Sequence, residues 1–121
     1  MKRVAVIEDN ADNRLLLQAL LDGRYDLTEY ENGPEGIQGI RSAPPDAVLL
    51  DISLPGMDGV EVLSRIRREP RLAKLPVIAL TAHAMAGDRD RYLAAGFDEY
   101  VTKPIVDENV LLSALQRLLE K

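Results

Sequence analysis

The sequence contains no cysteine and a single histidine, His83, among its 121 residues. Without cysteine the chain has no disulfide, no thiolate metal site and no cysteine nucleophile. Because His83 has no second histidine to bind a metal with, we interpret it as a loop residue rather than a zinc ligand. Only five residues are aromatic (four Tyr and one Phe), although 46% are hydrophobic, so the core must be mostly aliphatic.

A basic stripe and a long apolar run are also lacking. The net charge of −5 argues against nucleic acid as a direct partner. The apolar run at 4–7 is too short for a signal peptide, and no segment reaches the roughly 18 consecutive apolar residues of a membrane span. We therefore expect a cytoplasmic protein without membrane insertion.

The residues that are present alternate regularly between short apolar runs and helical patterns. Such runs, apolar on both faces, are typical of strands buried in a parallel sheet. Right-handed crossovers between them predict an α/β fold with three layers, a five-stranded parallel sheet between two layers of helices. The expected strands are 4–7, 26–30, 47–50, 77–80 and 99–101, and the expected helices are 12–22, 33–42, one beginning after Asp58, 86–95 and 107–119.

Two of these helices carry leucine-rich patterns. In the first helix, Leu15, Leu16 and Leu20 recur at helical spacing, and Gly23 is placed to end it. Asp58, with Glu61 three residues later, predicts a helix N-cap of the capping-box kind. The last helix is expected to present one apolar face made of Val110, Leu111, Leu115 and Leu118.

Polar residues follow the strongest predicted strands, at the point where each strand ends. They are Glu8 and Asp9, then Asp51, Thr81 and Lys103. In an open parallel sheet the carboxyl ends of the strands meet at one edge, where such folds bind ligands. Three carboxylates gathered there repel one another unless a cation lies between them, and hard oxygen ligands favour Mg²⁺.

This set of groups predicts a phosphoryl site. A divalent ion and the Lys103 ammonium can neutralise phosphoryl oxygens, and Thr81 can donate a hydrogen bond to one of them. A carboxylate is a known covalent phosphate acceptor. Asp51 is the best candidate for the acceptor because it ends the middle strand.

Each of these residues also has a simpler explanation when it is taken alone. An acid after a strand is usually a turn or N-cap residue. Thr81 could cap the following helix, and Lys103 could be a solvated cation. The phosphoryl-site interpretation rests on four strand ends that each carry a member of one chemical set.

These residues, together with the segments around them, resemble the receiver domain of two-component response regulators. The resemblance runs from about residue 3 to 119 and is carried by the segments 6–10, 50–59 and 80–82 and by Lys103-Pro104. It resembles the chemotaxis-regulator-like, single-domain type. The resemblance implies a flavodoxin-like fold with strand order 2-1-3-4-5.

The resemblance also implies the site chemistry. Asp51 would take a phosphoryl group from the phosphohistidine of a histidine kinase or a histidine phosphotransfer protein. Mg²⁺, with Mn²⁺ as an alternative ion, would be held by Asp9, Asp51 and the backbone carbonyl of Ser53. Glu8 would contact the ion partly through a water molecule.

The resemblance further implies a switch. Thr81 would bond a phosphoryl oxygen and move toward it, Lys103 would pair with another, and Tyr100 would turn inward. On sequence alone Tyr100 could equally be a half-buried strand aromatic. The Lys103-Pro104 bond matches the usual cis peptide of such domains, which a proline makes inexpensive.

Two further residues occupy positions that tune phosphate lifetime in such domains, Ser53 and His83. Our hypothesis is that the His83 ring shields the acyl phosphate from water and prolongs its lifetime beyond seconds. A rival class is a Mg²⁺-dependent phosphatase with an aspartyl-phosphate intermediate, but Ser53 stands where that enzyme would need its second acid. A third alternative is a degenerate receiver that only binds partners.

We expect residues 1–121 to form one receiver domain without an effector domain and without turnover of an external substrate. The Met1 start and the polar end favour a stand-alone protein over a piece of a longer regulator or hybrid kinase. The downstream target would be a protein that docks on the face formed by 86–95, 99–101 and 107–119. A monomer or a weak, phosphorylation-dependent dimer is expected.

Overall fold

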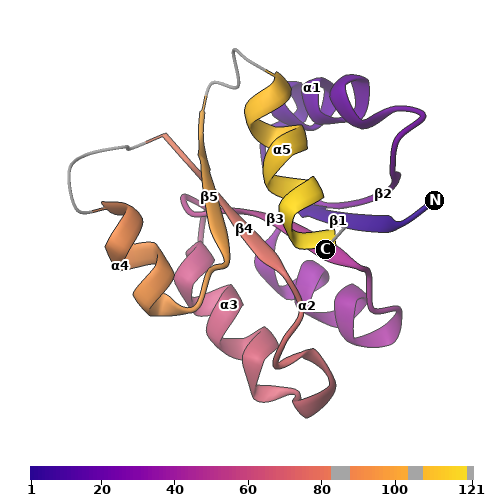
Figure 1. Cartoon of the computed structure of the whole chain (residues 1–121). Coiled ribbons are helices and arrows are strands. Elements are labelled where there is room, and N and C mark those ends of the chain that lie inside the picture. The colour runs from indigo at the N-terminus through magenta and orange to yellow at the C-terminus, as the bar shows by residue number, and fades with distance from the viewer. Residues whose placement is uncertain (83–87, 104–107, 120–121) are drawn as a thin grey trace.

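The structure, a computed structural model, describes residues 1–82, 88–103 and 108–119. Strands and helices alternate along this part of the chain (Figure 1). The strands are β1 (Arg3–Ile7), β2 (Asp26–Tyr30), β3 (Ala47–Asp51), β4 (Val77–Thr81) and β5 (Glu99–Thr102). The helices are α1 (Ala11–Leu21), α2 (Gly33–Ser42), α3 (Gly59–Arg68), α4 (Asp88–Ala95) and α5 (Glu108–Leu119), with a short 3₁₀ helix, η1 (Pro70–Leu72).

The sheet has the predicted topology. Its five strands are parallel and lie in the order β2-β1-β3-β4-β5. The three central strands are almost wholly buried, because helices cover both faces. Helices α1 and α5 lie on one face, and α2, α3 and α4 lie on the other (Figure 1). The three-layer α/β sandwich expected from the sequence is therefore confirmed.

Two separate aliphatic cores result from the alternation of side chains along each strand. Ala5 and Ile7 of β1 point toward α2, α3 and α4, whereas Val4 and Val6 point toward α1 and α5. The few aromatic side chains gather mainly in the first of these cores, where Tyr92 and Phe97 are buried. None of the helices in the described ranges is long and apolar enough to cross a membrane.

Helix boundaries follow the capping residues. Asp58 caps α3 as predicted, because its Oδ1 accepts a hydrogen bond of 2.9 Å from the Glu61 N–H. The Glu61 carboxylate pairs with Arg65 one turn later, at 3.0 Å. Gly23 follows α1 with φ +74°, a left-handed conformation that suits glycine at the end of a helix.

The leucine spacing of α1 does not show which side is buried, and the apolar face predicted for α5 is partly wrong. Leu15 is 63% exposed and Leu16 is 38% exposed, and α1 buries Leu17 and Leu21 against the sheet. This helix carries leucine at five of its last seven positions, so periodicity alone does not select the buried side. In α5 the predicted Val110 is 51% exposed, and Leu112 and Ala114 join Leu111 and Leu115 in the core.

Candidate functional site

The sheet register brings the predicted site residues to one edge. Ile7 lies beside Leu50, and Asp51 lies beside Leu80, so the residues that end β1, β3 and β4 are neighbours. The Lys103 N–H donates to the Thr81 carbonyl at 2.7 Å, which ties the end of β5 to the end of β4. The strand ends thus converge as the sequence predicted.

Three carboxylates form a compact cluster at this edge. One oxygen from each of Glu8, Asp9 and Asp51 can be chosen so that all three atoms lie within 4.8 Å of one another. Glu8 and Asp51 are buried, and Asp9 is exposed. Like charges this close, on buried side chains, repel strongly unless protons or cations compensate them.

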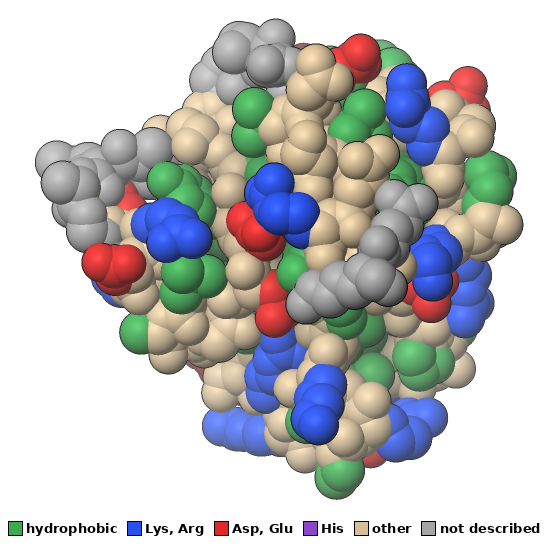
Figure 2. Space-filling view, viewed as in Figure 1, with side chains coloured by type: hydrophobic (Ala, Val, Ile, Leu, Met, Phe, Trp, Pro, Cys, Tyr) green, Lys and Arg blue, Asp and Glu red, His purple; other side chains and the backbone are tan. Residues whose placement is uncertain are grey.

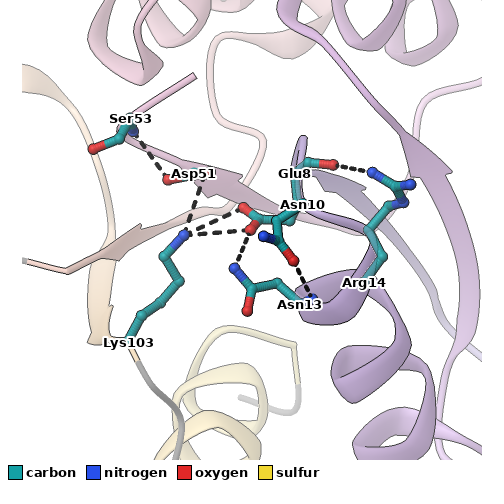
Figure 3. A network of polar contacts seen from close by, with 7 residues as sticks. All are labelled: Glu8, Asn10, Asn13, Arg14, Asp51, Ser53 and Lys103. Atoms are coloured by element: carbon teal, nitrogen blue, oxygen red, sulfur yellow. Dashed lines mark hydrogen bonds and ion pairs between the residues drawn. The ribbon is translucent and has the colours of Figure 1, made fainter. Parts of the chain in front are cut away.

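Lys103 provides one of the compensating charges. Its Nζ lies 3.2 Å from Asp51 Oδ2 and 3.3 Å from Glu8 Oε1, and its side chain is only 17% exposed. Figure 3 shows the ammonium reaching between the two carboxylates from the end of β5. A half-buried ion pair of this kind is screened far less than a surface pair.

A proton on the Glu8 carboxyl group provides the second compensation for the repulsion between the acids. Burial raises the pKa of Glu8 to about 7, and the hydrogen bond with Asp51 adds to the shift. Asn13 Nδ2 donates to Glu8 Oε1 at 2.5 Å, and Arg14 Nη1 donates to the Glu8 carbonyl at 2.8 Å. In this structure Glu8 is therefore held in place by α1 and is ready to carry a proton near neutral pH.

The pKa of Asp51 shifts in the opposite direction. Burial alone would raise its pKa, but hydrogen bonds with Glu8 and the Ser53 N–H, together with Lys103, lower the pKa below its ordinary value. The Ser53 N–H lies 2.9 Å from Asp51 Oδ1. Asp51 is therefore an ionised, oriented carboxylate, which is the form that a nucleophile or a metal ligand requires.

Close backbone packing also fixes Asp51. Gly59, the first residue of α3, lies against the Asp51 peptide, and a Cβ at this position would come within 2.6 Å of the Asp51 carbonyl oxygen. The Gly59 N–H donates to the Ile52 carbonyl at 2.9 Å. Only glycine allows the start of α3 to approach the end of β3 this closely.

The donor set fits a hard divalent cation. Carboxylate oxygens are the ligands that Mg²⁺ prefers, and one or two carboxylates with several waters are its usual protein environment. An exposed Asp9 beside two buried acids leaves one side of the cluster open to solvent. The excess of acidic groups over the single ammonium of Lys103 is the feature that an added cation would balance.

Thr81 and Tyr100 lie on the same face of the sheet. Thr81 is 1% exposed, and its Oγ1 lies 3.2 Å from Tyr92 Oη of α4. Tyr100 is half-buried, and its ring centroid is 6.3 Å from that of Tyr92. His83 and Pro104 lie outside the described residues, so the roles predicted for His83 and for the Lys103-Pro104 peptide stay predictions.

Sequence reasoning missed several residues that shape this site. Asn10 caps α1 through a 3.0 Å hydrogen bond from the Asn13 N–H, and Asn13 in turn contacts Glu8. The signal was present, because an asparagine directly before the first residue of a helix is a typical N-cap. Tyr92 carried no such signal, because a lone tyrosine in a polar helix gives no indication of what its hydroxyl contacts.

Comparison with known proteins identifies the family. The family model for the response regulator receiver domain matches residues 4–116. The chain therefore belongs to the response regulator receiver domain family, and the resemblance noted in the sequence is confirmed.

Among similar proteins, the polar-differentiation response regulator DivK of Brucella anthropi is 38% identical over 105 residues, which are 86% of this chain and 85% of DivK. The signal transduction histidine-protein kinase BarA of Escherichia coli K12 is 37% identical over 88% of this chain. The chain spans only 12% of BarA.

A solved structure is also very similar. The receiver domain of the sensor histidine kinase PA1611 from Pseudomonas aeruginosa has a TM-score of 0.89 and 32% identity, covering 99% of this chain and 98% of that one. It is described with a magnesium ion coordinated in its active-site cleft. The chemotaxis protein CheY4 of Vibrio cholerae has a TM-score of 0.90 and 25% identity, covering 98% of this chain and 99% of CheY4.

Proposed function

We propose that this receiver domain is a phosphorylation switch in which Asp51 accepts a phosphoryl group from a phosphohistidine donor. The observation that carries the proposal is the position of Lys103 Nζ, 3.2 Å from an ionised, buried Asp51 within a cluster of three acids. Family membership supports the same role in two-component signalling. The donor would be a histidine kinase or a histidine phosphotransfer protein.

The step is a direct phosphoryl transfer. An Asp51 carboxylate oxygen attacks phosphorus, and a P–O bond forms as the P–N bond to the donor imidazole breaks. The electron pair of that bond stays on the imidazole nitrogen, and the ring leaves neutral when its other nitrogen carries a proton. Lys103 pairs with one phosphoryl oxygen, and the Thr81 hydroxyl donates a hydrogen bond to another.

Asp9, Asp51 and the Ser53 carbonyl would hold Mg²⁺, with Glu8 acting partly through water. When bound, the ion supplies positive charge for the phosphoryl oxygens. The 2.9 Å bond from the Ser53 N–H to Asp51 supports this assignment, because it keeps the Ser53 peptide beside the carboxylate. The acidic cluster and the magnesium described for PA1611 support it as well.

The output is a change of protein contacts rather than turnover of an external substrate. Phosphorylation adds charge and acceptor oxygens beside Thr81 and Lys103, which can favour a second packing of α4, β5 and α5. This face would dock a downstream protein, in a monomer or a weak dimer. Family membership argues against the phosphatase alternative, in agreement with the serine at position 53.

A phosphoryl adduct tests the proposal. Incubation with Mg²⁺ and acetyl phosphate should add one phosphoryl mass to the wild-type chain in intact mass spectrometry, and a chelator should abolish it. Asp51→Asn should carry no adduct, whereas Asp46→Asn, an exposed acid at the opposite end of the same strand, should be labelled like wild type. An adduct of undiminished yield on Asp51→Asn would contradict the proposal.

A further inference from the structure

Tyr92 links α4 to the end of β4 from inside the core. Its ring is 3% exposed, and its Oη lies 3.2 Å from Oγ1 of Thr81, which is 1% exposed. This hydrogen bond is long for a pair of hydroxyls, and its buried setting protects it from water. Tyr92 therefore contacts the side chain that the proposed function assigns to the phosphoryl oxygen.

Arg91 also forms a hydrogen bond with the Tyr92 hydroxyl. Arg91 Nη2 donates to Tyr92 Oη at 3.2 Å, and the Arg91 guanidinium carbon lies 5.0 Å from the centroid of the Tyr92 ring. A phenol oxygen that accepts from Arg91 still has its own proton to donate to Thr81. If Thr81 withdraws, Tyr92 still accepts a hydrogen bond from Arg91, but an O–H that donated to Thr81 loses its acceptor, which adds to the cost of breaking the contact.

The Tyr92 ring packs against two other aromatic rings. Phe97 packs against it edge to face, with centroids 6.2 Å apart and an interplanar angle of 87°. The centroid of the Tyr100 ring lies 6.3 Å from that of Tyr92, with an interplanar angle of 45°. Aromatic contacts of this kind hold the ring where it is, so its hydroxyl cannot follow Thr81 over more than a small distance.

We propose that Tyr92 is a positioning residue that holds Thr81 in its unphosphorylated place, so that phosphorylation must break this hydrogen bond. The inference rests on the proposed function, in which Thr81 moves toward a phosphoryl group on Asp51. A contact made in only one of two states shifts the equilibrium toward that state. The Tyr92 ring also packs against Tyr100, so the hydrogen bond links Thr81 to the contact between α4 and β5.

Tyr92→Phe removes the hydroxyl and keeps the ring. We expect this variant to bind fluoroberyllate, a phosphoryl mimic, more tightly than wild type in saturating Mg²⁺, as measured by ¹⁹F NMR titration. The expected gain is about two- to tenfold, the range that corresponds to one neutral hydrogen bond. Tyr30→Phe is the matched control, because Tyr30 packs on the same core from β2, and its affinity should equal that of wild type.

A double-mutant cycle tests the contact itself. In the Mg²⁺-free protein, the effects of Tyr92→Phe and Thr81→Val on the unfolding equilibrium constant, measured by urea denaturation, should be non-additive by about two- to tenfold. A hydroxyl that only fills space would give additive effects in this cycle. Additive effects would overturn the inference.

The outcomes separate the two proposals. Wild type that fails to bind fluoroberyllate would overturn the proposed function and this inference together. Wild type that binds it, with Tyr92→Phe binding equally or more weakly, would overturn the inference and leave the proposed function standing. Tighter binding by Tyr92→Phe, with Tyr30→Phe unchanged, supports both.

Discussion

Two buried carboxyl groups a few ångströms apart have opposite affinities for a proton in this protein. Burial and the neighbouring Asp51 raise the pKa of Glu8 to about 7, whereas hydrogen bonds and Lys103 lower that of Asp51. Below neutral pH the pair therefore holds one proton, and Glu8 carries most of it. This difference leaves Asp51 ionised, as a phosphate acceptor requires.

The shared proton predicts a pH-dependent metal affinity. Because Mg²⁺ must displace the proton on Glu8, its affinity should rise with pH up to the Glu8 pKa of about 7 and level off above it. Isothermal titration calorimetry at several pH values measures this profile. Glu8→Gln should flatten it, and a wild-type profile that is flat across neutral pH would contradict the assignment.

A second prediction for a single residue concerns Lys103. Lys103→Met leaves Glu8 and Asp51 facing each other, so the metal-free variant should lose about 2 kcal/mol of unfolding free energy above the pKa of Glu8. Mg²⁺ should restore part of this loss in urea denaturation, because it replaces the missing charge.

The control for Lys103 is Arg117→Met. Arg117 forms an ion pair with Glu99 at 2.9 Å, but its side chain is 57% exposed. Since water already screens that pair, the variant should change stability little, with or without Mg²⁺. Equal losses in the two variants would mean that Lys103 is only a surface cation.

At the scale of elements, the site depends on how closely α3 approaches the end of β3. Gly59→Ala would place a methyl group 2.6 Å from the Asp51 carbonyl oxygen and 2.8 Å from the Ile52 Cα, both of them backbone atoms. We expect a loss of about 1–3 kcal/mol in unfolding free energy and weaker Mg²⁺ binding, because Asp51 must shift.

Ser64→Ala is the control within the same helix. Ser64 is exposed on α3, and alanine there should leave stability unchanged or slightly improved. Thermal unfolding of both variants separates a local clash from a general effect on α3. If the Gly59→Ala variant were as stable as the Ser64→Ala variant, the close approach of α3 to Asp51 would tolerate a side chain, and the prediction would be wrong.

Strand positions and strand ends could be predicted from the sequence because each buried strand is a short apolar run bounded by polar residues. The runs at β1, β3 and β4 end in Glu8, Asp51 and Thr81, and a parallel sheet must bring those ends together. The acidic cluster and the place of Lys103 followed from that rule. The family resemblance supplied the strand order.

Other features depend on contacts that no local pattern contains. Leucines of α1 lie on several sides of the helix, and only its packing against the sheet shows that Leu17 is buried and Leu15 is not. The pKa of Glu8 depends on burial and on Asn13, and the contact between Thr81 and Tyr92 joins residues from two elements. Such properties arise from tertiary packing, which periodicity does not encode.

For the molecule as a whole, charge is unevenly distributed. In Figure 2, Lys and Arg side chains are spread over the view, and several of them lie in its lower part, where Figure 1 shows α3. The last turn of α3 alone carries Arg65, Arg67 and Arg68. The acidic cluster lies at the other end of the sheet, where its carboxylates favour the approach of a cation.

The central claim concerns the whole chain, because it states that one residue among its 20 acidic ones carries the phosphate. Borohydride reduction converts a phosphorylated aspartate to homoserine and so marks the acceptor. After labelling with acetyl phosphate and Mg²⁺, peptide mass spectrometry should find homoserine at position 51 and nowhere else. Homoserine at Asp9 or at any other acid, with position 51 unchanged, would contradict this account.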